Sequence, residues 1–181
     1  MKNKGQYRCD RVVSFEGREG EPLLQGNLYR GKTRIAFVSD DSHGGPMRIN
    51  WLDRETKAEV KTRSLFGEER TYQGTFEEAL LAKHCYEIPP TPSAHLNLGK
   101  LEYTDPEIFL GNLLNLAAET KRFKRMAKTR LLFRQPGDER GAWRSLNRPD
   151  SPESRSYVTQ KYAGAVFFCD GKHDPDGDPI E

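Results

Sequence analysis

The sequence predicts a single α+β domain, with an N-terminal antiparallel β-meander followed by helices and a second β-hairpin. Three observations predict this class. Apolar and polar residues alternate with period two through much of 6–52. Helix-capping patterns follow at 75–78 and 105–106, and two β-rich segments flank a turn near Gly137. At 181 residues, 35% of them hydrophobic, the chain is long enough for one domain, which we expect to span 1–170.

The meander is predicted from four β-rich segments. In the first, apolar residues at every second position predict one buried face, with Arg11 as the exception. The segments 23–29 and 33–38 follow, and the tight connection at 30–32 predicts a hairpin. The fourth segment, 47–51, again alternates. The residues expected on the buried face of the first segment are Tyr7, Cys9, Val13 and Phe15.

The helices are predicted mainly from the signals at their ends. Thr75 and Glu78 form a capping-box pattern, which opens a helix to about Tyr86. The pair at 105–106, Asp followed by Pro, begins the longest helix, which we expect to end near residue 128. The charged segment 54–64 is weakly amphipathic, so a further helix is expected there.

The rest of the chain contains a connector, a hairpin and a last helix. Prolines make the segment 88–93 a stiff connector that cannot be helical. The segments 129–135 and 142–146 predict the second hairpin. Ser151 caps a short helix that Gly164 ends, and an apolar strand follows it.

The composition indicates in which cellular compartment the protein is expected. The chain contains no apolar run near the roughly 18 residues of a membrane span, and we expect neither a secretory signal nor a membrane partner. The cysteines Cys9, Cys85 and Cys169 are odd in number and widely spaced, which favours reduced thiols in a cytoplasm over a disulfide framework. No cofactor or metal pattern is evident. The acidic residues 171–181 predict a flexible tail.

One segment matches the phosphate-loop pattern G-x-x-x-x-G-K-[ST], from Gly26 to Thr33. A phosphate loop needs a helix directly after it, so that the helix N-terminus faces the phosphates. The residues 33–38 are instead β-branched and aromatic. We therefore interpret the match as coincidental and as part of a hairpin, and we expect Lys32→Ala to leave function intact.

A Gly-rich loop at 39–46 interrupts the sheet. Adjacent glycines permit a left-handed backbone, and their amides can form an anion-binding nest. Three interpretations stay open: a wide turn or bulge that shapes the strand, a binding surface, or a metal or catalytic site, for which the ligands are few. The candidate residues are Asp40, Asp41, His43, Gly44 and Gly45.

A basic run ends the longest helix and continues beyond it, with no acidic residue between Thr120 and Gln135. It is either a solvated face that suits the helix dipole or a contact for phosphates or an acidic protein surface. Its helical cations share a face with Leu110, Leu114 and Ala117. Either the helix bends, or its C-terminal half projects past the core with Phe123, Met126 and Ala127 buried instead. The candidate residues are Lys121, Arg122, Lys124, Arg125, Lys128, Arg130 and Arg134.

Three motifs carry a resemblance: Tyr29-Arg30-Gly31-Lys32, the loop 39–46 with its Ser-x-Asp-x-x-Gly-Gly pattern, and the segment 128–137. Together they resemble a family of small uncharacterised accessory proteins encoded by bacteriophages and plasmids. The chain departs from that family where its hairpin turn lacks an Asp and where Ser42 replaces a Gly. The resemblance implies an accessory gene of a mobile genetic element, and countering a host defence system is the role expected of such a gene.

The leading hypothesis is a non-enzymatic accessory protein that acts by binding and inhibits a bacterial defence system, in the manner of an anti-CRISPR or other anti-defence protein. Its partner would be a host defence protein or a nucleoprotein complex. One alternative is a nucleic-acid-binding protein that contacts DNA or RNA with the basic helix end. Another is a nucleotide- or anion-binding sponge that uses the Gly-rich loop. An enzyme is disfavoured because no nucleophile–base pair is evident.

Overall fold

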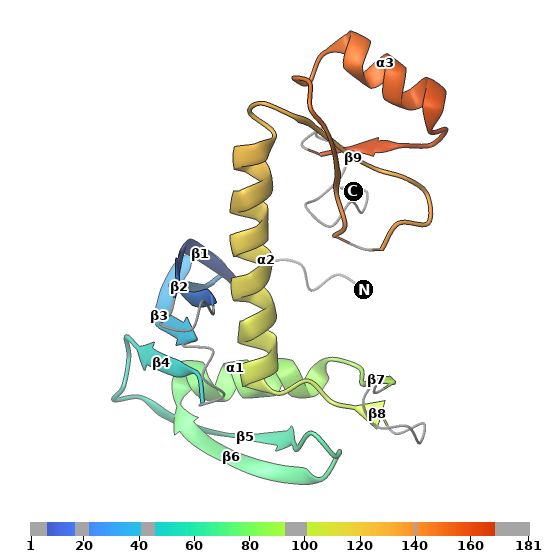
Figure 1. Cartoon of the computed structure of the whole chain (residues 1–181). Helices are drawn as coiled ribbons and strands as arrows, with labels where there is room; N and C mark the ends of the chain where they lie inside the picture. Colours follow the sequence, from blue (N-terminus) through green and yellow to red (C-terminus); the bar gives the residue numbers. More distant parts are fainter. Residues whose placement is uncertain (1–6, 17–21, 41–45, 93–100, 140, 169–181) are drawn as a thin grey trace. The chain divides into compact units, whose positions relative to one another are not determined.

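The structure is a computed structural model, and it describes residues 7–16, 22–40, 46–92, 101–139 and 141–168. It has the predicted α+β class, with an antiparallel sheet first, helices after it and a small three-stranded sheet near the end (Figure 1).

Contacts divide the chain into two compact units. The N-terminal unit comprises Met1–Ala118 and the C-terminal unit comprises Glu119–Glu181. The division lies inside the long helix, and not at the proline-rich connector 88–93. Whether the units unfold together, as a single domain over 1–170 would, stays a prediction.

The predicted four-stranded meander is confirmed. The strands pair antiparallel in the order β1-β2-β3-β4 (Figure 1). Their bounds are β1 Tyr7–Glu16, β2 Pro22–Arg30, β3 Thr33–Asp40 and β4 Arg48–Trp51.

A β-bulge in β1 corrects the predicted buried face. Two residues of this strand, Arg11 and Val12, lie opposite the single residue Gly26 of β2. Arg11 has a left-handed backbone with φ of 53°, and the bulge shifts the alternation by one residue. Val12 is therefore buried, whereas Val13 and Phe15, which were expected inside, are exposed. The prediction holds before the bulge and is wrong after it.

The segment that matches the phosphate-loop pattern is a β-hairpin. Arg30 of β2 pairs with Thr33 of β3, and Gly31 turns the chain with φ of 58°. A strand rather than a helix follows Lys32, so the turn lacks the directly following helix that a phosphate loop requires.

The helix expected at 54–64 is wrong, because strand β5, Lys57–Arg63, occupies this segment and pairs with β6, Glu69–Thr75. Ala58, Val60 and Thr62 are at least half-buried and alternate with exposed charged residues, which is the period of a strand.

The predicted starts of the first two helices are confirmed. Helix α1, Phe76–Glu87, begins with a capping box in which the Thr75 hydroxyl accepts from the Glu78 amide and the Glu78 carboxylate accepts from the Thr75 amide. Helix α2, Pro106–Met126, begins where the Asp105 carboxylate accepts from the Ile108 amide at 2.8 Å. Two short strands, β7 Thr91–Pro92 and β8 Leu101–Glu102, pair between the helices.

The core of the N-terminal unit lies between the meander and the two helices. Arg30 and Glu77, joined by a double hydrogen bond at 2.6 and 2.8 Å, tie the β2–β3 hairpin to α1. The buried residues of this core are Tyr7, Cys9, Val12, Leu24, Leu28, Ile35, Ala36, Val38, Trp51, Leu81, Cys85, Leu110 and Leu114.

The C-terminal unit contains the predicted second hairpin, the last helix and the last strand. Strand β9 lies between β10 and β11, and both pair antiparallel with it. Its core is small: Leu131, Phe133 and Val158 form one buried cluster with half-buried apolar residues around them, and Leu132 and Phe168 are also buried. The elements are β9 Leu131–Arg134, β10 Arg144–Leu146, α3 Pro152–Lys161 and β11 Val166–Phe167.

Candidate nucleic-acid interface

The basic run lies on the second half of α2, the turn after it and strand β9. Arg134 at the end of β9 is half-buried, and the other six side chains are exposed. We call these residues the basic surface: Lys121, Arg122, Lys124, Arg125, Lys128, Arg130 and Arg134.

The apolar residues of this half of α2 explain why its cations are exposed. Phe123, Met126 and Ala127 are half-buried, and the Phe123 ring centroid lies 5.9 Å from that of Phe168. In this half of α2, Phe123, Met126 and Ala127 therefore turn inward and the lysines and arginines face solvent, as one of the two alternatives from the sequence expected.

The helix dipole accounts for part of the basic surface. The last carbonyls of α2 are met by turn amides: Ala127 donates to Phe123 at 2.8 Å, and Arg130 donates to Met126 at 3.0 Å. Lys124 and Arg125 in the last turn stabilise this negative end. The dipole acts only within that turn, so it does not explain cations that continue into β9.

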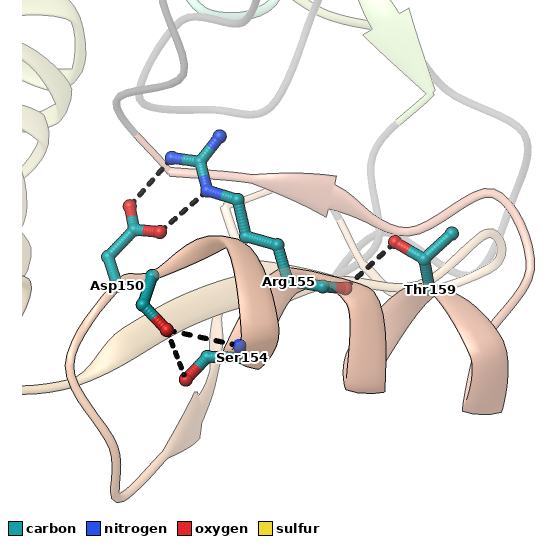
Figure 2. Close-up of polar contacts among 5 residues, drawn as sticks. Asp150, Ser154, Arg155 and Thr159 are labelled. Carbon is teal, nitrogen blue, oxygen red and sulfur yellow. Dashed lines mark hydrogen bonds and ion pairs between the residues drawn. The ribbon is translucent and has the colours of Figure 1, made fainter.

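Other arginines of the C-terminal unit are held in ion pairs. Arg144 binds Asp138 through two hydrogen bonds of 2.6 and 2.8 Å, and this holds the pKa of Asp138 down at about 2. Arg155 binds Asp150 through two bonds of 2.6 Å (Figure 2). Neither pair includes a residue of the basic surface, although the charge of Arg134 also helps to lower the pKa of Asp138.

Sequence reasoning missed a cation, Arg148, that is joined through its backbone to strand β9, and a ring, Tyr157, that lies close to this cation. The Leu131 amide donates to the Arg148 carbonyl at 2.7 Å, which places the Arg148 backbone next to that of Leu131, the residue after Arg130. The Arg148 guanidinium lies 5.8 Å from the ring centroid of Tyr157, an exposed residue of α3. The only sequence signal was the hairpin itself, in which Leu146 of β10 pairs with Leu131 of β9, two residues before Arg148.

Of the candidate residues in the Gly-rich loop, the structure describes only Asp40. Asp40 is the last residue of β3, where it is half-buried and pairs with Leu24. The other candidates, Asp41, His43, Gly44 and Gly45, lie outside the described residues. Its three interpretations therefore stay predictions.

Titratable side chains also meet inside the N-terminal unit. The rings of Tyr7, His84 and Phe109 lie with centroids 5.0 to 6.0 Å apart. Burial raises the pKa of Tyr7 to about 12 and lowers that of His84. Burial also raises the pKa of the neighbouring Cys85 thiol to about 12, which leaves little reactive thiolate at neutral pH.

Arg63 of β5 is held between two tyrosine rings. Its guanidinium lies 4.8 Å from the Tyr86 centroid and 5.4 Å from that of Tyr103. Glu69 lies 3.9 Å away on the paired strand. These contacts connect β5 to α1 and to the segment before α2, so we assign Arg63 a role in packing.

Within the described ranges, no group of three or more His, Cys, Asp or Glu side chains could hold a metal ion. None of the helices that the structure describes is long and apolar enough to cross a membrane. Comparison of the chain with protein-family models, curated proteins and solved structures found no match.

Proposed function

We propose that this protein acts by binding, and that its basic surface contacts the phosphates of a nucleic acid, either free or within a host nucleoprotein complex. The observation that carries the proposal is the group of exposed cations that continues from α2 into the turn before β9. Cations placed on successive phosphates release bound counterions, which supplies affinity without any base-specific contact.

Salt dependence is the signature of such binding. The affinity is expected to fall linearly with salt on a logarithmic scale, and each lost phosphate contact reduces the slope by about one. Lys124 and Arg125, which are both exposed on α2, are suitable residues to change. The double variant Lys124→Glu, Arg125→Glu should bind DNA and RNA more weakly at low salt, with a slope reduced by about two.

A matched control separates local charge from total charge. Two reversals from Lys or Arg to Glu change the formal net charge by −4, from +2 to −2. Lys57→Glu with Lys61→Glu makes the same change on exposed positions of β5. We expect this control to retain most of the affinity. Equal losses in both variants, or binding that salt does not weaken, would contradict the proposed surface.

A second candidate function is inhibition of a host defence complex. The resemblance at Tyr29–Lys32 and 128–137 favours it, because it implies a mobile-element accessory protein. We expect the chain to capture a nucleic-acid-handling defence complex from host lysate at modest salt, and the Lys124→Glu, Arg125→Glu variant to capture less. Recovery of no defence component by either protein would remove this candidate without affecting the nucleic-acid proposal.

A further inference from the structure

We propose that Tyr157 and Arg148 form a stacking platform for an unpaired base, so that the preferred nucleic acid is single-stranded DNA or RNA. This inference rests on the proposed function, because it adds a base contact to the phosphate contacts of the basic surface. Tyr157 is 46% exposed, and the Arg148 guanidinium lies 5.8 Å from its ring centroid. Bases stack on tyrosine rings and on guanidinium planes alike.

The period of α3 places Tyr157 outside the core. Ser154 and Val158, one turn apart, are the buried residues of this helix. Tyr157 precedes Val158 and is rotated from it by about 100° around the helix axis. The aromatic contact of this core is made instead by Tyr162, whose ring stacks on Phe133 with centroids 5.5 Å apart. The exposed ring of Tyr157 is therefore not needed to fill the core.

Hydrogen bonds fix the platform on both sides. The Arg148 carbonyl accepts from the Leu131 amide at 2.7 Å, which anchors it to β9. The first turn of α3 is held by the Asp150–Arg155 pair and by the Ser151 hydroxyl, which accepts from the Ser154 amide at 3.2 Å (Figure 2). A platform whose backbone is already ordered loses little conformational entropy when a ligand binds.

The platform lies next to cations that can hold the strand. The Arg148 backbone lies next to that of Leu131, the residue after Arg130, because the Leu131 amide donates to the Arg148 carbonyl. Backbone-tracking cations with an adjacent stacking ring are the usual arrangement for single-stranded nucleic acid. A duplex keeps its bases stacked inside, so its phosphates can reach the basic surface while its bases cannot reach Tyr157.

The test measures binding of the full chain to labelled single-stranded DNA, single-stranded RNA and a DNA duplex of equal length by fluorescence anisotropy. Tyr157→Ala should weaken single-strand binding about tenfold and leave duplex affinity within about twofold. Tyr157→Trp should retain single-strand affinity, because indole also stacks. Phe66→Ala removes another exposed ring, on the β5–β6 hairpin, and should change neither affinity.

The outcomes separate this inference from the function on which it rests. Wild-type binding that Tyr157→Ala leaves unchanged would overturn the platform alone. An equal loss on single strands and on the duplex would also overturn it, since a stacked base would not then explain the effect. No binding of the wild-type chain to any of the three probes would overturn both proposals. A loss confined to DNA or to RNA would support the platform and identify the strand.

Discussion

At the scale of single residues, Gly26 shows how one position allows a local irregularity. It lies opposite the β1 bulge, and a Cβ built on it would lie 2.8 Å from Val12 Cγ2, 3.2 Å from Leu114 Cδ2 and 3.3 Å from the Asp10 carbonyl oxygen. Val12 and Leu114 are both buried, so neither can move away freely. The same residue begins the apparent phosphate-loop motif, and its glycine is explained by packing.

Gly26→Ala should therefore destabilise the protein by about 1–3 kcal/mol, since the added methyl group overpacks a filled site. Gly111→Ala is the matched control, because this helical glycine has only Met47 Cε nearby, at 3.8 Å. It should stabilise the protein by about 0.5–1 kcal/mol through helix propensity. Urea unfolding of both variants measures the two effects. A Gly26→Ala variant as stable as the wild type would show that the side chains around the bulge can make room for a methyl group.

His84 makes stability depend on pH. Burial among Tyr7 and Phe109 lowers its pKa, while the nearby charge of Glu87 opposes that shift. The unfolded chain therefore binds a proton at a pH where folded His84 stays neutral. The free energy of unfolding should fall as pH drops below about 6.5, the unfolded pKa, and stop falling below the folded pKa.

Urea unfolding at a series of pH values from 8 to 5 tests this expectation, with His84→Phe as the comparison. The variant should lose this part of the pH dependence, because phenylalanine has no proton to bind. Carboxylates such as Asp138, whose pKa is about 2, stabilise the folded chain at these pH values and lose that stabilising effect only in more acidic solution. Identical slopes in the two proteins between pH 6.5 and 5 would exclude His84 as the source.

At the scale of secondary-structure elements, the sequence predicted the features that depend on neighbouring residues, such as helix starts. The capping box at Thr75 and the Asp105–Pro106 start are correct because each helix end satisfies its amides with nearby side chains. The helix expected at 54–64 was wrong because its few apolar residues alternate and pair with β6, a partner strand that the charged sequence did not reveal. The β1 bulge was missed for a related reason, since it depends on the bare backbone of Gly26 in another strand.

The α1 capping box allows a clean measurement at this scale. Thr75→Ala removes the hydroxyl that accepts from the Glu78 amide at 3.3 Å and should destabilise the protein by about 1 kcal/mol. Thr71→Ala, on an exposed position of the adjoining strand β6, should cost less than about 0.5 kcal/mol. Thermal unfolding of the two variants compares them. Equal losses of stability in the two variants would mean that strand propensity, and not the cap, accounts for the effect of Thr75→Ala.

At the scale of the whole molecule, the sequence predicted part of the candidate interface. The basic residues were evident because they are contiguous in the chain. Arg148 and Tyr157 were not, since a tertiary hydrogen bond joins the Arg148 backbone to Leu131 and the path to α3 brings Tyr157 close to the Arg148 guanidinium. Contiguous charge is visible in a sequence, whereas a site assembled by tertiary hydrogen bonds requires the register of the strands.

The two compact units have cores of different size, and this difference bears on whether the chain unfolds cooperatively. The N-terminal unit buries a large core around Leu28, whereas the C-terminal unit has a smaller buried cluster around Leu131, with Leu132 and Phe168 also buried. If the units open separately, amides of β9 should exchange with solvent faster than those of β2. Leu131→Ala, which costs about 2–5 kcal/mol in a filled core, should then accelerate exchange in 131–134 and leave 24–30 unchanged. Leu28→Ala is the reciprocal variant. If Leu131→Ala accelerates exchange equally in both units, the chain unfolds as the single domain that the sequence predicted.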